Sequence, residues 1–144
     1  GLNSVVKIFD EENKIIATSP VISKTGKVIA YIPNGKYSVQ YADGQKYKAV
    51  VASSSDEFIV LVPETDKEFT PVSIAKDMKT GKTVVLIAGD TVYQGIIQNA
   101  STTATSIDPN KTINGSFLLD LTGSLVGVNI NNTFVPAAII TPYI

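Results

Sequence analysis

Short apolar runs rich in β-branched and aromatic residues alternate with turn residues along the whole chain. This rhythm predicts an all-β protein, because an amphipathic helix would repeat its apolar positions every three to four residues. In the first half we expect six strands, at residues 5–9, 15–22, 28–32, 37–41, 47–52 and 58–62. Glycine turns at residues 24–26, 34–35 and 43–44 predict three hairpins between neighbouring strands.

The second half of the chain repeats this pattern. We expect strands at residues 72–74, 84–88, 92–98, 102–107, 117–121 and 125–130, and a tail strand at residues 134–140. A short helix would fit only at residues 73–79. The polar stretch 63–69, PETDKEF, has a proline and no periodicity, which predicts a linker. We therefore expect a first β-barrel at residues 1–66 and a second at residues 67–144.

Composition and charge narrow the class of protein. The chain has 144 residues, of which 44% are hydrophobic, and this is enough for a folded core without disulfides. Twelve dispersed lysines and no arginine stand against 13 acidic residues, so we expect no nucleic-acid partner. No apolar run approaches the roughly 20 residues that span a bilayer, and membrane attachment is expected only through segments outside this chain.

The chain contains no histidine and no cysteine. The absence of histidine removes the usual general base and makes a Ser-His-Asp triad impossible. The absence of cysteine removes the thiolate nucleophile and the thiolate metal site, and we expect no metal and no cofactor. Two carboxylate pairs, Asp56 with Glu57 and Glu64 with Asp66, are more typical of surface turns than of a hydrolytic or cation site.

Four segments follow one another in an order typical of a known family. They are residues 17–30 (ATSPVISKTGKVIA), 39–51 (VQYADGQKYKAVV), 55–62 (SDEFIVLV) and 114–130 (NGSFLLDLTGSLVGVNI). The order resembles the protease domain of the HtrA/Do family, whose members are trypsin-like serine proteases. In that family the first segment precedes the catalytic histidine, the third carries the catalytic aspartate and the last carries the catalytic serine.

The resemblance implies an all-β, trypsin-like double β-barrel made of two six-stranded antiparallel barrels. It places Pro33 near the position of the histidine, and Asp56 or Glu57 at that of the aspartate. Asn114 takes the position of the serine. Thr112 stands where the family has its oxyanion-hole glycine, and a β-branched residue resists the backbone geometry that such a hole requires. The resemblance therefore implies a degenerate protease domain whose catalytic triad is lost.

We therefore expect a pseudoprotease, a non-catalytic module with a binding, scaffolding or assembly role in a larger protein. Its partner would be a protein or an extended peptide, bound by strand addition in the groove between the barrels. The resemblance alone favours the cell envelope or the extracellular space. One alternative is a structural or adhesive β-domain of a cell-surface protein. Another is a hydrolase that uses carboxylates or a Ser-Lys dyad.

Overall fold

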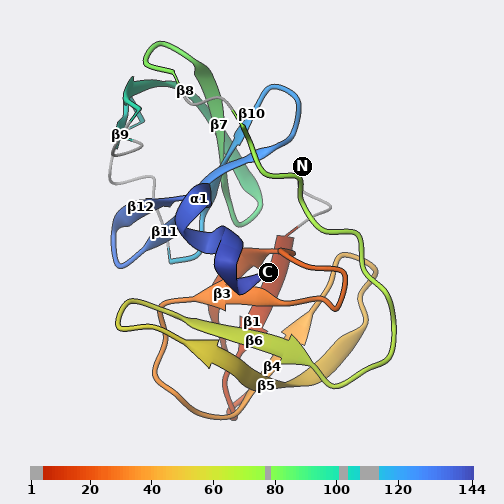
Figure 1. The fold of residues 1–144 in the computed structure, drawn as a ribbon. Coiled ribbons are helices and arrows are strands. Elements are labelled where there is room, and N and C mark those ends of the chain that lie inside the picture. The colour runs from red at the N-terminus through yellow and green to blue at the C-terminus, as the bar shows by residue number, and fades with distance from the viewer. Residues whose placement is uncertain (1–4, 77–78, 101–103, 108–113) are drawn as a thin grey trace.

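The computed structural model describes residues 5–76, 79–100, 104–107 and 114–144, and these form two β-sheets (Figure 1). The first sheet contains β1 (Val5–Phe9), β2 (Ile15–Pro20), β3 (Val28–Ala30), β4 (Tyr37–Gln40), β5 (Lys46–Ser54) and β6 (Ile59–Pro63). Its six strands lie in the order β2-β1-β4-β5-β6-β3, and every pairing is antiparallel. Among the described residues, no helix is long and apolar enough to cross a membrane.

The second sheet is built from the other half of the chain. It contains β7 (Thr83–Ala88), β8 (Thr91–Asn99), β9 (Ala104–Thr105), β10 (Phe117–Asp120), β11 (Leu125–Ile130) and β12 (Thr133–Pro136). These strands lie in the order β12-β11-β10-β7-β8-β9. The four-residue helix α1 (Ala137–Ile140) and a 3-10 turn (Thr141–Tyr143) follow, and in Figure 1 they lie between the two sheets.

The first sheet curls into a nearly closed barrel, in which the edge strands β2 and β3 face each other. The Ile22 N–H donates to the Lys27 carbonyl at 2.9 Å, but no backbone ladder joins the two strands. The fully buried Ser19 hydroxyl closes the seam instead. It accepts the Ile29 N–H at 2.9 Å and donates to the Pro20 carbonyl at 2.7 Å. One side chain thus supplies the hydrogen bonds that a backbone partner would give.

Two of the three predicted hairpins are wrong. Only the turn at Asp43 and Gly44 joins strands that pair, β4 and β5. Gly26 has the positive φ of 87° that a tight turn needs, but β3 after it pairs with β6. The stretch with Asn34 and Gly35 connects β3 to β4, which do not pair. The physical reason is burial, because β3 and β6 are apolar on both faces and pair where both faces are covered.

Two strand predictions in the second half are also wrong. In residues 72–74 only Ile74 makes a bridge, to Leu125, and the described part of residues 73–79 is not helical. The expected tail strand ends at Pro136, and α1 follows it. Proline has no N–H to continue a ladder, and its fixed φ suits the residue before a helix. The other predicted strands are confirmed to within two residues where the structure describes them.

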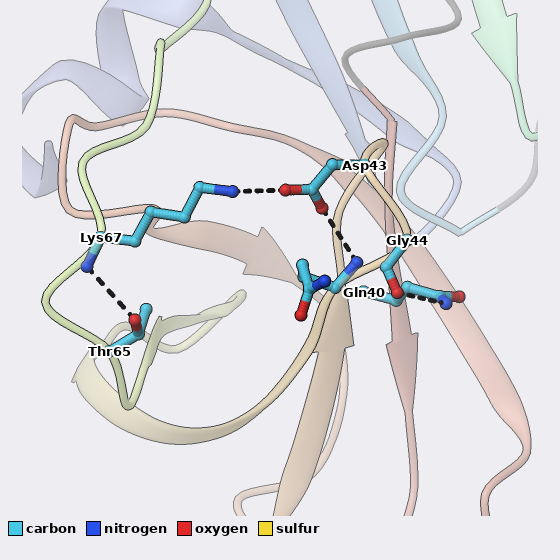
Figure 2. A network of polar contacts seen from close by, with 6 residues as sticks. Gln40, Asp43, Gly44, Thr65 and Lys67 are labelled. Carbon is cyan, nitrogen blue, oxygen red and sulfur yellow. Dashed lines mark hydrogen bonds and ion pairs between the residues drawn. The ribbon is translucent and has the colours of Figure 1, made fainter.

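The predicted linker packs closely on the first barrel (Figure 2). The Lys67 ammonium forms an ion pair with Asp43 in the β4–β5 turn. The ring of Phe69 lies on that of Tyr41, with centroids 4.3 Å apart. A Cβ at Gly26 would lie 2.7 Å from the Phe69 ring, so only glycine leaves room for this packing. The segment after β6 therefore covers one end of the first barrel.

The largest hydrophobic cluster lies between the two barrels. From the first barrel it contains Ile22, Ile29, Phe58 and Val60, and from the rest of the chain Ile87, Phe117, Leu119, Leu125, Val128, Ile130, Val135, Ala137 and Ile140. Smaller clusters fill the interior of the first barrel and the concave side of the second sheet. The shared core fixes the relative position of the loops at the junction of the barrels.

Candidate functional site

The loops that carry the predicted site residues approach one another around Tyr31, in the loop after β3. The side-chain amide of Asn114, just before β10, donates to the Tyr31 carbonyl at 3.1 Å. Tyr31 also lines a hollow together with Asp56 and Glu57, which form the β5–β6 turn. Pro33 follows two residues after Tyr31 in the same loop. Tyr31 is therefore a neighbour of both the Asn114 turn and the Asp56–Glu57 turn.

The backbone of the turn before β10 is hydrogen-bonded to both barrels. The Thr18 N–H in β2 donates to the Asn114 carbonyl at 3.3 Å, and the Gly115 N–H donates to the Asn129 carbonyl at 3.2 Å. Gly115 has a φ of +84°, and a Cβ there would lie 2.5 Å from the Thr18 carbonyl carbon. The Asn114 Oδ1 atom is buried and has no hydrogen-bond partner in the described part of the chain. A carboxamide held in this way is neither a nucleophile nor a base.

The other two predicted positions add no titratable group. The Pro33 carbonyl accepts a hydrogen bond from the Tyr37 hydroxyl, which stabilises the loop between β3 and β4. Thr112 lies in residues 108–113, outside the described residues. The predicted oxyanion position therefore stays a prediction.

The hollow at Tyr31 has a volume of about 250 Å³ and is bounded by both barrels. Its lining consists of Tyr31, Asp56 and Glu57 from the first barrel and Ile130, Asn131, Thr133 and Val135 from the second. We call it the junction hollow. The sequence did not predict the residues that the second barrel contributes to this lining.

Two turns shape the junction hollow. In the first barrel, the Ser55 hydroxyl accepts the backbone N–H of Glu57 at 3.1 Å and that of Phe58 at 3.2 Å. In the second, Asn131 and Asn132 form the β11–β12 turn with φ values of 53° and 61°. Positive φ at both central residues is the signature of a type I′ hairpin, which asparagine tolerates. The Asn-Asn pair between two predicted strands was the available signal for this turn.

The junction hollow carries two carboxylates that no described lysine neutralises. Both Asp56 and Glu57 are exposed. The ion pairs that the structure gives for its described residues are Lys67–Asp43 and Lys82–Asp120, so neither carboxylate in the hollow is paired with a lysine. Two adjacent carboxylates at the rim give this hollow an anionic character.

The hydrolase alternatives gain no support from the contacts seen. Glu64 lines a different hollow, of about 540 Å³, together with Lys36 and Lys48. The Lys46 ammonium lies over the Phe9 ring, 3.7 Å from its centroid. Among the described residues, no group of three or more acidic side chains could hold a metal ion. Asp10 and Glu11 line the hollow at Glu64 too, but its two lysines supply charges of the opposite sign, whereas the described lining of the junction hollow contains no lysine.

Comparison with known proteins bears on the fold. No family model matches the chain, and no curated protein matches it. The structure is similar to the crystal structure of the MamO protease domain from Magnetospirillum magneticum in its apo form, with a TM-score of 0.76 and 21% sequence identity. The match covers 99% of this chain and 96% of that one. The predicted fold class, an all-β, trypsin-like double β-barrel, is confirmed, with one nearly closed barrel and one half-barrel.

Proposed function

We propose that the chain is a degenerate, HtrA-like protease domain without catalytic activity, which binds an extended polypeptide at the junction of its two barrels. The hydrogen bond from the Asn114 side chain to the Tyr31 carbonyl carries this proposal. In the HtrA/Do resemblance Asn114 takes the position of the nucleophilic serine. A side chain that joins the two barrels at this position has a structural role in place of a chemical one.

The composition supports the loss of catalysis independently of any alignment. The chain has no histidine, so no imidazole can activate a serine or be oriented by Asp56 or Glu57. Among the bases that form a dyad with a serine nucleophile, lysine is the one that this composition retains. The ammonium groups of Lys46, Lys67 and Lys82 contact Asn13, Asp43 and Asp120, respectively.

The geometry of β12 supports peptide binding. This strand is the last in the sheet order, and an extended peptide binds by adding a strand to such an edge. The side chains of Thr133 and Val135, two residues apart on one face of β12, line the junction hollow. A peptide paired with β12 would therefore place a side chain in this hollow. A structural or adhesive domain would be favoured by a β-sandwich, which differs from the strand order seen here.

Incubation with unfolded casein tests the loss of catalysis. We expect that the purified chain at stoichiometric amounts releases no peptides above the buffer background, as measured by mass spectrometry. Asn114→Ser should be equally inactive, because a restored hydroxyl still has no histidine to activate it. Active trypsin at a thousandth of the amount serves as the positive control.

Reproducible cleavage would contradict the proposal if it co-purifies with the chain. Loss of that cleavage in a lysine-to-alanine or serine-to-alanine variant would assign it to a Ser-Lys dyad. Cleavage that survives all such variants and varies between preparations would identify a contaminating protease and leave the non-catalytic reading intact.

A further inference from the structure

Resting on the peptide-binding function proposed above, we propose that the junction hollow selects a lysine or arginine side chain of the bound polypeptide. The proposal combines the size of the hollow, its apolar floor and its anionic rim. Each of these properties excludes a different class of side chain.

The size and floor of the hollow fit a long, partly apolar side chain. Its volume of about 250 Å³ lies below the roughly 300–1,000 Å³ of sites for drug-sized ligands. Ile130 and Val135, which are 2% and 7% exposed, give the hollow a small apolar floor within a mostly polar lining, and Tyr31 is 46% exposed. The alkyl stem of a lysine or arginine covers such a floor while its head stays near water. A short polar side chain would leave the floor uncovered.

The carboxylates at the rim of the hollow determine which charge the bound side chain must carry. Asp56 and Glu57 lie there, and among the described residues no lysine is paired with them. Two backbone hydrogen bonds to Ser55 hold their turn, which keeps the backbone that carries both carboxylates at the rim. A cationic head would form charge-assisted hydrogen bonds with them, and the exposed Tyr31 ring offers it an aromatic face. A glutamate or aspartate side chain would be repelled.

Matched peptides test the selection. We would titrate three acetylated and amidated pentapeptides, Thr-Val-Arg-Val-Thr and its central Gln and Glu variants, into the ¹⁵N-labelled chain and follow the backbone amides by NMR. We expect the arginine peptide to bind about tenfold more tightly than the glutamine peptide, because two carboxylates face its head. The largest shifts should occur at Tyr31, Glu57 and Thr133.

Two charge-matched variants provide the control. In Asp56→Asn/Glu57→Gln the preference for arginine over glutamine should fall to about twofold or less, because the charge is removed at the rim. Glu11→Gln/Glu12→Gln removes two exposed charges from the β1–β2 turn. In this variant the preference for arginine over glutamine should be the same as in the wild type. Both pairs are exposed, so both variants should keep the dispersed spectrum of the folded chain.

The outcomes separate this inference from the function on which it rests. Equal affinity for the three peptides, with shifts at the junction hollow, would overturn the charge selection and leave peptide binding in place. An arginine preference that survives Asp56→Asn/Glu57→Gln would place the selecting charge elsewhere and overturn the inference. The absence of shifts with any peptide at millimolar concentration would overturn both proposals.

Discussion

At Gly115 the second barrel lies directly against the backbone of the first. Its backbone has a positive φ, and a Cβ in its place would overlap the Thr18 carbonyl of the opposite barrel. Glycine is therefore required for two separate reasons, the backbone conformation and the absence of a side chain. In the HtrA/Do resemblance this glycine is kept while the serine before it is lost. The contact between barrels explains why glycine is needed here without any reference to catalysis.

Gly115→Ala should lower the free energy of unfolding by about 3 kcal/mol or more, because it adds a backbone clash to the cost of positive φ. Gly123 is the matched control, since its φ is also +84° but no atom lies within 4 Å of a Cβ there. Gly123→Ala should cost only about 1 kcal/mol. Urea denaturation followed by circular dichroism measures both values. Equal losses in the two variants would contradict the close approach to Thr18.

Most strands were predictable from the sequence, whereas two of the three predicted strand pairings were wrong. The run of residues 58–62 is apolar throughout, and a continuous apolar run predicts a strand but does not reveal which neighbour it joins. Gly26 reverses the direction of the chain, but a turn glycine does not determine which strand β3 pairs with. The burial of both faces of β3 explains its pairing with β6. The sequence likewise predicted a surface turn at Asp56, but it could not show that this turn and Asn114 have Tyr31 as a common neighbour.

The β10–β11 hairpin depends on one buried carboxylate. Asp120 is 8% exposed, and it accepts hydrogen bonds from the Thr122 N–H, the Thr122 hydroxyl and the Ser124 N–H at 2.9, 2.6 and 2.9 Å. It also pairs with Lys82 at 3.4 Å, just before β7. Burial raises the pKa of Asp120, but these hydrogen bonds outweigh it, so the pKa lies below its usual value. The folded state therefore favours the ionised carboxylate.

This lowered pKa predicts acid sensitivity. A carboxyl group whose pKa is lower in the folded state stabilises the fold above its unfolded pKa, and the contribution is lost as the pH falls through the folded pKa. Asp120→Asn should therefore lower the unfolding free energy at pH 7, and the difference from the wild type should shrink between roughly pH 5 and pH 2. Urea titrations at several pH values measure this. Asp66→Asn, at an exposed position, controls for net charge, and a difference that stays constant with pH would refute the prediction.

The two barrels form one packing unit, because their largest cluster is shared. Phe58 belongs to the first barrel by sequence, yet it packs in the common core and against the Tyr143 ring, with centroids 4.9 Å apart. The two sheets meet near residue 66 in the sequence, and the largest cluster contains residues from both sides of that point. Because Ile130 and Val135 in the lining of the junction hollow belong to this shared cluster, the hollow depends on the packing of both barrels.

Phe58→Ala should lower the stability of both sheets by the same amount, about 3–5 kcal/mol. Native-state hydrogen exchange should show this as an equal loss of protection at the slowest amides of β6 and of β11. Val50→Ala, at a position that is 46% exposed, should leave both nearly unchanged. If β11 keeps its protection in Phe58→Ala, the barrels unfold independently.

The seam between β2 and β3 also affects whether copies of the molecule associate with each other. An unpaired strand edge is a template for aggregation, because its N–H and carbonyl groups can pair with another chain. In the first barrel both edges face inward across the Ser19 seam, so neither is open to a neighbour. The remaining edges, β12 and β9, have four and two residues in the described structure. Such short edges limit self-association, because a second chain that pairs with β12 gains hydrogen bonds along four residues at most.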